Sequence, residues 1–164
     1  MKNFKLNKGF TLIELLIVIA IIGVLSTLLM VNFVAIRQRS RDVARKADLS
    51  HIQESLEMYR ADQGNYPVSG SSSGNFPTSC GSGVSFKNAA GTTTYMPAIP
   101  CDSLGSTYWN NGVYYYYTGD SGVTYSITAC LENTSDKDQN ITSTPPTGAP
   151  SNCPNNLYYV LQNP

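Results

Sequence analysis

The chain has 164 residues, enough for one domain of ordinary size. Charged residues make up only 13% of it and the formal net charge is zero, so it lacks the strongly basic footprint of a nucleic-acid-binding protein. The positive and negative charges are unevenly distributed along the chain. Lys2, Lys5 and Lys8 give the first nine residues a charge of +3, and the other 8 basic and 11 acidic residues give residues 10–164 a charge of −3.

A long apolar segment follows the short basic stretch of residues 1–9. From Phe10 to Phe33 the sequence reads FTLIELLIVIAIIGVLSTLLMVNF, in which Glu14 is the single charged residue. A helix of these residues is about 36 Å long, enough to cross the hydrocarbon core of a membrane. A removable secretory signal would end in a small-residue cleavage site, and no convincing one follows Leu25. We therefore expect residues 10–33 to form a membrane-spanning helix.

The helical pattern continues beyond Phe33, with neither proline nor glycine before Gly64. Four apolar residues recur at i, i+3, i+7 and i+10, on one helical face: Leu49, Ile52, Leu56 and Tyr59. Gly64 is a typical C-terminal stop, and Pro67 prevents continuation. We expect one helix over residues 10–63, about 80 Å long. Its second half, residues 34–63, offers a single apolar stripe to the rest of the chain.

Residues 64–164 are expected to form a C-terminal globular domain of strands and loops. Residues 68–107 are rich in Gly, Ser, Thr and Pro, which predicts a surface loop with little regular structure. The Tyr-rich run Val113–Thr118, a glycine-containing turn and the alternating residues 123–131 predict a hairpin whose second strand has one apolar face. Leu157–Gln162 adds a last strand. The predicted fold class is α+β, with the long helix packed on a small antiparallel sheet.

Four cysteines lie in the C-terminal half: Cys80, Cys101, Cys130 and Cys153. Their even number in a loop-rich region indicates two disulfides and an oxidising compartment. No two of them have the short C-x₂₋₄-C spacing that zinc sites favour. Four cysteines allow three connectivities, of which we expect the sequential one, Cys80–Cys101 with Cys130–Cys153.

Basic residues flank both ends of the apolar segment, so loop charge alone does not decide its orientation. Five of them follow it: Arg37, Arg39, Arg41, Arg45 and Lys46. The cysteines favour a C-terminal half outside the cell membrane and a cytoplasmic N-terminus. The basic cluster fits contact with lipid head groups or with acidic patches of adjacent subunits, and it fits an ordinary solvated helix face equally well.

The residues Lys8-Gly9-Phe10-Thr11-Leu12-Ile13-Glu14-Leu15-Leu16, with the apolar run after them, resemble the N-terminus of type IV prepilins and type II secretion pseudopilins. The detailed resemblance ends at about residue 67. It implies the type IV pilin fold and a leader peptide, residues 1–9, which a prepilin peptidase removes between Gly9 and Phe10. It also implies N-methylation of Phe10 and pairing of the Glu14 carboxylate with the N-terminal amine of a neighbouring subunit.

Physical chemistry gives Glu14 the same role. A carboxylate within a membrane is costly and needs a partner, and removal of the leader creates an amine at Phe10 as the nearest opposite charge. The alternative is a simple single-pass anchor in which Glu14 lies near the membrane surface.

The resemblance implies a structural function, as a subunit of an extracellular type IV pilus used for adhesion, motility or DNA uptake. Its implied partners are further copies of the chain in a helical filament, the prepilin peptidase, an assembly platform with its ATPase, and the inner membrane before assembly. Nucleic acid stays open as a partner. The alternatives are a pseudopilin of a type II secretion system and a membrane-tethered binding module. Two disulfides and the lack of a convincing calcium loop favour the pilus.

No enzymatic activity, cofactor or metal is expected. The sequence contains no Gly-rich phosphate loop, H-E-x-x-H or G-x-S-x-G motif, and its lone histidine, His51, has no partner at motif spacing. Asp136-x-Asp138-x-Asn140 resembles the start of a calcium loop, but Ile141 replaces the turn glycine and no glutamate closes the loop. A solvated acidic loop is therefore the preferred interpretation.

Overall fold

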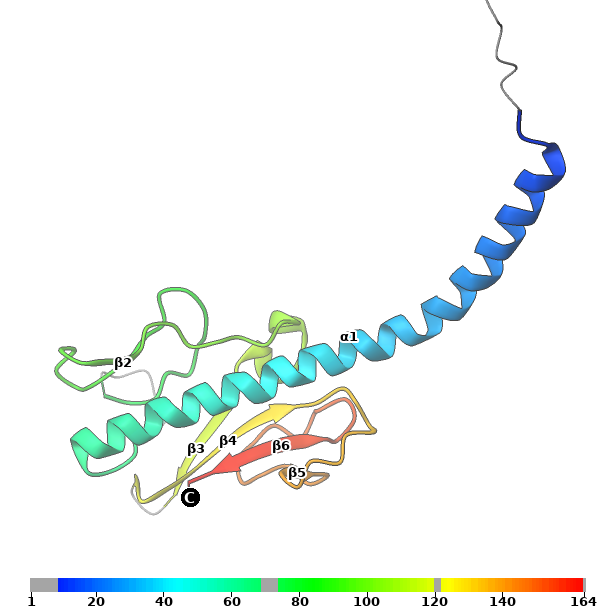
Figure 1. Cartoon of the computed structure of the whole chain (residues 1–164). Helices are drawn as coiled ribbons and strands as arrows, with labels where there is room; N and C mark the ends of the chain where they lie inside the picture. The colour runs from blue at the N-terminus through cyan, green and yellow to red at the C-terminus, as the bar shows by residue number, and fades with distance from the viewer. Residues whose placement is uncertain (1–8, 69–73, 120–121, 164) are drawn as a thin grey trace, which may run out of the picture. The chain divides into compact units, whose positions relative to one another are not determined.

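The computed structural model describes residues 9–68, 74–119 and 122–163 (Figure 1). A single long helix precedes a series of short strands, which confirms the predicted α+β class. The elements are α1 (Leu12–Gln63), β1 (Phe86–Lys87), β2 (Thr94–Met96), the 3₁₀ turns η1 (Gly105–Thr107) and η2 (Trp109–Gly112), β3 (Tyr115–Gly119), β4 (Thr124–Cys130), β5 (Ile141–Thr142) and β6 (Tyr158–Gln162). The chain divides into two units, Met1–Arg37 and Gln38–Pro164, and α1 contributes to both.

Helix α1 ends where the sequence predicts. Gly64 adopts a φ of +84°, a left-handed conformation that glycine adopts without steric cost, and its N–H donates to the Arg60 carbonyl at 2.8 Å. The chain then leaves the helix axis through Tyr66, whose N–H donates to the Gly122 carbonyl at 2.8 Å. The hydrogen bond ties the end of α1 to the β3–β4 connection.

Four strands form an antiparallel sheet in the order β3-β4-β6-β5, side by side in Figure 1. The predicted hairpin is present as β3 and β4, with Tyr116 opposite Ile127, and the predicted last strand is β6, with Tyr159 opposite Ala129. Strand β5 was not predicted, because two residues are too few to show an alternating pattern.

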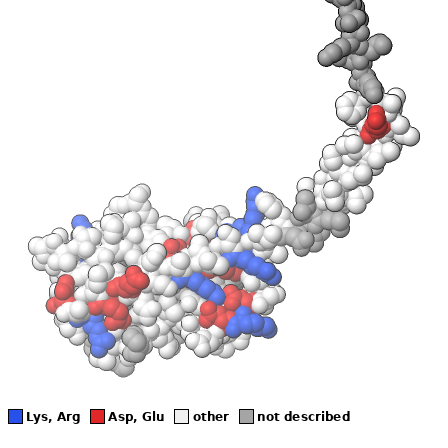
Figure 2. Space-filling view, viewed as in Figure 1, with Lys and Arg blue, Asp and Glu red and all other residues white. Residues whose placement is uncertain are grey.

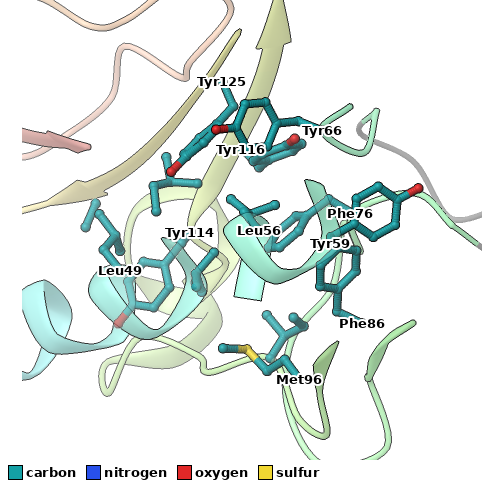
Figure 3. Packing of buried hydrophobic residues seen from close by; sticks show 14 of the residues in the cluster. Leu49, Leu56, Tyr59, Tyr66, Phe76, Phe86, Met96, Tyr114, Tyr116 and Tyr125 are labelled. Carbon is teal, nitrogen blue, oxygen red and sulfur yellow. The ribbon is translucent and has the colours of Figure 1, made fainter. Parts of the chain in front are cut away.

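The apolar stripe of α1 packs on this sheet, as predicted. Leu49, Ile52 and Leu56 are completely buried, and Tyr59 closes the stripe against Phe86 with ring centroids 5.2 Å apart. Figure 3 shows the stripe surrounded by aromatic side chains from both the sheet and the loops. Each such side chain contributes about 1.5–3 kcal/mol by leaving water, so the stripe holds the sheet to the helix.

The prediction that residues 68–107 have little regular structure is wrong for part of that segment. β1 and β2 pair as a small second sheet, and five of the segment's apolar residues belong to the core: Phe76, Phe86, Tyr95, Met96 and Ile99. Tyr95 and Met96 are adjacent and the other three are irregularly spaced, so the set gives no periodic signal of burial.

Both faces of β4 are buried, whereas the sequence indicated one apolar face. Ile127 and its alternate neighbours face α1, while Thr128 and Cys130 lie on the opposite face. That opposite face is covered by Trp109 and Tyr158, which pack with the second disulfide as a separate cluster. Trp109 comes from the η2 turn and Tyr158 from the neighbouring strand β6, and the periodicity of β4 carries no information about either residue.

Candidate assembly site

The expected cleavage site lies in exposed, non-helical backbone immediately before α1. Gly9 and Phe10 precede the first helical residue, and the Phe10 side chain is 91% exposed. The peptide bond between them is therefore outside the helical hydrogen-bond ladder. Residues 1–8 of the predicted leader lie outside the described part of the chain.

Thr11 and Glu14 cap the first turn of α1 reciprocally. The Thr11 N–H and hydroxyl donate to Glu14 Oε2 at 2.8 and 2.7 Å, and the Glu14 N–H donates to Thr11 Oγ1 at 3.3 Å. This is a capping box, in which the first residue and the third helical residue satisfy each other's free backbone donors. It turns the Glu14 carboxylate back toward the start of the helix, next to the residue that follows Phe10. This contact was not predicted, although Thr-x-x-Glu before an apolar run is the sequence signal for it.

Large apolar side chains cover the whole circumference of the first half of α1. Between Ile13 and Leu25, ten such residues are 50–66% exposed within their unit. The two hydroxyls that follow are satisfied inside the helix, since Ser26 donates to the Ile22 carbonyl and Thr27 to the Val24 carbonyl, both at 2.8 Å. A helix that is apolar on all sides is stable only when other apolar groups surround it.

Among the residues whose side chains are described, the structure contains no helix with the length and apolarity required to cross a membrane. Residues 28, 29, 31 and 32 of the predicted span are outside that set. The membrane-spanning role of residues 10–33 stays a prediction.

The basic cluster of α1 mostly forms internal ion pairs instead of a solvated face. Arg45 is 1% exposed and donates through Nη1 to Asp42 at 2.6 Å and to Glu132 at 2.8 Å, and through Nη2 to Asp102 at 3.0 Å. Its guanidinium lies 4.6 Å from the centroid of the Tyr108 ring. Figure 2 shows acidic and basic atoms side by side over the C-terminal unit. A buried cation of this kind is tolerated only because three carboxylates surround it.

Neighbouring contacts complete this network. Arg41 forms a two-point ion pair with Glu132, with Nε donating at 2.7 Å and Nη2 at 2.5 Å. Asp42 also accepts the backbone N–H groups of Glu132 and Asn133. Burial alone would raise the pKa of Glu132, but its hydrogen bonds with Arg41 and Arg45 hold it below the ordinary value. Burial alone would lower the pKa of Arg45, but its hydrogen bonds to Asp102, Glu132 and Asp42 raise it above the ordinary value, so the guanidinium is charged at neutral pH.

The ammonium group of Lys46, on α1, binds the acidic loop that resembles a calcium site. Its Nζ lies 2.8 Å from Asp136 Oδ2 and 3.1 Å from Asp138 Oδ2, and 5.0 Å from the centroid of the Tyr159 ring. The hydrogen bond from Lys46 lowers the pKa of Asp136. Within the described residues there is no group of three or more His, Cys, Asp or Glu side chains arranged to hold a metal ion. The two carboxylates are thus bound by an ammonium group of the same chain, and the solvated loop that the sequence favoured is in fact an ion-paired one.

Two disulfides fix the loops that supply these carboxylates. Cys80 is bonded to Cys101 and Cys130 to Cys153, with Cα–Cα distances of 5.2 and 5.6 Å. The sequential pairing expected from the sequence is confirmed. His51 is exposed on α1.

A family model described as the prokaryotic N-terminal methylation motif matches residues 4–30. The type II secretion system core protein G of Escherichia coli (strain K12) is 29% identical over 104 residues, which are 62% of this chain and 70% of that protein. The type IV wide pilus major component PilA4 of Thermus thermophilus is 49% identical over 59 residues, 36% of this chain and 45% of that protein. The type IV major pilin protein PilA of Myxococcus xanthus is 29% identical over 107 residues, 59% of this chain and 49% of that protein.

The match therefore spans about half the length of each of these two pilins and more of the secretion protein. No solved structure matches the chain at a comparable level of significance. The methylation motif covers the apolar N-terminus, and the relatives extend the similarity into the domain packed on α1. In its N-terminal methylation motif, its long N-terminal helix and its antiparallel sheet, the chain is similar to type IV pilins and type II secretion pseudopilins.

Proposed function

We propose that this chain is a structural subunit of an extracellular type IV pilus, which serves adhesion, motility or DNA uptake. The observation that carries the proposal is the exposed apolar surface around α1 from Ile13 to Leu25. Each large side chain in it gains about 1.5–3 kcal/mol when it is fully buried, so helices packed together would hold a filament without covalent links. Copies of the chain are the natural source of such helices.

In this proposal the precursor lies in the inner membrane with a cytoplasmic N-terminus. A prepilin peptidase removes residues 1–9 and leaves an N-methylated amine at Phe10. Since Thr11 already turns the Glu14 carboxylate toward the helix start, the carboxylate is oriented to meet the amine of a neighbouring subunit. An assembly platform and its ATPase then drive polymerisation.

A pseudopilin of a type II secretion system is the second candidate, because the similarity to core protein G extends over 70% of that protein. One structural feature favours the pilus over a calcium-holding pseudopilin. The two carboxylates of the calcium-like loop, Asp136 and Asp138, are occupied by Lys46. A membrane-tethered binding module is the third candidate, and it requires neither cleavage at Gly9 nor a polymer.

Mass spectrometry of filaments sheared from cells distinguishes the three candidate functions. For a pilus subunit we expect an abundant species that begins at methylated Phe10. A processed protein that stays in the membrane fraction would indicate a pseudopilin or a minor role. A membrane-bound monomer that retains Met1–Gly9 would leave only the tethered module.

Glu14 is tested by substitution against a matched control. We expect Glu14→Ala to insert into the membrane normally but to yield far fewer filaments. Glu54→Ala changes another exposed glutamate of α1, one for which the described residues offer no ion pair, and should leave the yield close to that of the unaltered chain. Normal filament yield from Glu14→Ala would remove Glu14 from the assembly mechanism.

A further inference from the structure

The carboxylates around Arg45 come from segments far from it in the chain. Asp102 is 57 residues away in the loop before β3, and Glu132 is 87 residues away in the loop after β4. Asp42 is on the same helix as Arg45, and its carboxylate accepts hydrogen bonds from the backbone N–H groups of Glu132 and Asn133 in the second loop. The environment of Arg45 is therefore complete only when both loops lie against α1.

A disulfide holds each of these loops. Cys101 precedes Asp102 directly, and Cys130 is two residues before Glu132. A further contact links the second disulfide to the guanidinium, because the Tyr108 hydroxyl lies 3.4 Å from Cys130 Sγ while its ring lies under Arg45. The sulfur atoms and the buried cation thus belong to one continuous set of contacts.

The position of Arg45 on α1 makes these contacts obligatory. Arg45 lies one helical turn before Leu49, which is completely buried against the sheet. Packing the sheet on Leu49 therefore takes the guanidinium out of water as well. If Asp102 and Glu132 are absent from their places, that burial leaves Asp42 as the remaining carboxylate beside the guanidinium, and Nε and Nη2 lose their acceptor, which favours the open state of the domain.

We propose that the two disulfides control, through the buried Arg45 guanidinium, whether the C-terminal domain closes over residues 42–59 of α1. The oxidised chain closes, and the chain with four thiols stays open or only loosely packed. Closing both bonds removes four protons and four electrons from the thiols. Two equivalents of a disulfide oxidant accept them and leave as thiols. The domain would then pack on its helix only in an oxidising compartment.

The test compares the full chain in detergent micelles, oxidised and after reduction, with a variant that lacks the Arg45 guanidinium and the Asp102 carboxylate, Arg45→Met/Asp102→Asn. The measured quantity is the fall in Tm on reduction. Disulfides that act only by restricting the unfolded chain would lower Tm equally in both proteins, because independent effects add. We expect the fall in Tm on reduction to be about twofold larger in the unaltered chain than in the variant. In the unaltered chain, reduction also takes Asp102 and Glu132 away from the Arg45 guanidinium. Equal falls would overturn the proposal.

Hydrogen exchange gives a local readout that does not depend on the variant. The backbone N–H of Leu104 donates to Asp102 at 2.9 Å, and that of Glu132 donates to Asp42 at 3.0 Å. On reduction of the unaltered chain we expect both amides to exchange at least about tenfold faster. Unchanged protection of both amides would show that the loops stay closed without the disulfides, and would also overturn the proposal. Both measurements use the monomer, so their outcome is independent of whether the chain forms a pilus.

Discussion

Asp102→Ala tests how much the buried ion network contributes to stability. Asp102 accepts hydrogen bonds from Nε and Nη2 of Arg45 and is itself 6% exposed. Without it, Asp42 and Glu132 still bind Nη1, but the other two donor nitrogens lose their acceptor. Breaking a buried pair by removing one partner costs about 3–5 kcal/mol, and we expect the lower end because two carboxylates remain. At about 2–4 °C per kcal/mol for a chain of this size, the Tm should fall by about 6–12 °C.

The assay is thermal unfolding of the oxidised full chain in micelles, followed by the near-UV circular dichroism of its tyrosines. This signal reports tertiary packing, so the helix inside the micelle does not mask the transition. Glu54→Ala is the matched control, since Glu54 is an exposed carboxylate of the same helix. We expect it to change stability by less than about 0.5 kcal/mol.

A double variant shows whether the loss of stability comes from the unpaired charge on Arg45. Arg45→Met/Asp102→Leu replaces two members of the ion network by apolar side chains of similar size, and Arg41 remains to pair with Glu132. Because well-packed apolar residues often match or exceed a buried ion pair in stability, we expect this protein to be more stable than Asp102→Ala. If the double variant is less stable than Asp102→Ala, the loss does not come from an uncompensated charge on Arg45.

Three further predictions concern the core, the helix end and pH. Leu56→Ala should lower the free energy of unfolding by about 2–5 kcal/mol because Leu56 is fully buried, whereas Met58→Ala, at a half-exposed site, should cost less than about 1 kcal/mol in the same denaturant titration. Gly64→Ala should cost about 1–2 kcal/mol, because a Cβ is strained at a φ of +84° although the space around it is open. Since the pKa of Glu132 is lowered in the folded state, its stabilisation is present above about pH 4.5 and is lost as pH falls through its folded value. Thermal melts between pH 7 and 3 should show this fall, and a Tm that rises below pH 4.5 would contradict it.

Local periodicity was sufficient to predict the elements that are regular and long. The stripe of Leu49 and Leu56, the stop at Gly64 and the β3–β4 hairpin each depend on residues within one or two turns or strands of each other. The short motif at the N-terminus was specific enough to indicate the family. These features are encoded locally, and a local interpretation of the sequence finds them.

The ion network could not be predicted in the same way. The sequence shows five basic residues between Arg37 and Lys46 and acidic residues throughout the C-terminal half, and any pairing between them is compatible with the pattern. Only the folded loops select Asp102 and Glu132 as the partners of Arg45. The capping box between Thr11 and Glu14 is a different case, because its four-residue signal was visible in the sequence and was not used.

Lys46 permits a sharp test of the calcium-like loop. A calcium ion needs six to eight oxygen ligands, usually several of them carboxylate oxygens. Here one ammonium group of the chain already pairs with both Asp136 and Asp138, and the backbone N–H groups of Asp138 and Asn140 donate to a second oxygen of each carboxylate. We therefore expect the Tm of the unaltered chain to be the same in millimolar Ca²⁺ and in excess chelator.

A bound calcium ion would raise the Tm by an amount that this experiment measures easily. A calcium site at one hundred times its Kd would add about 2.7 kcal/mol, or about 5–11 °C in Tm, and a shift of that size would show that the metal displaces Lys46. Lys46→Met, which removes the ammonium but keeps most of the side chain's apolar volume, should lower stability by about 1 kcal/mol, because the ion pairs are partly exposed. Together the two measurements separate a loop held by its own lysine, the arrangement that favours the pilus, from a loop that depends on a metal ion.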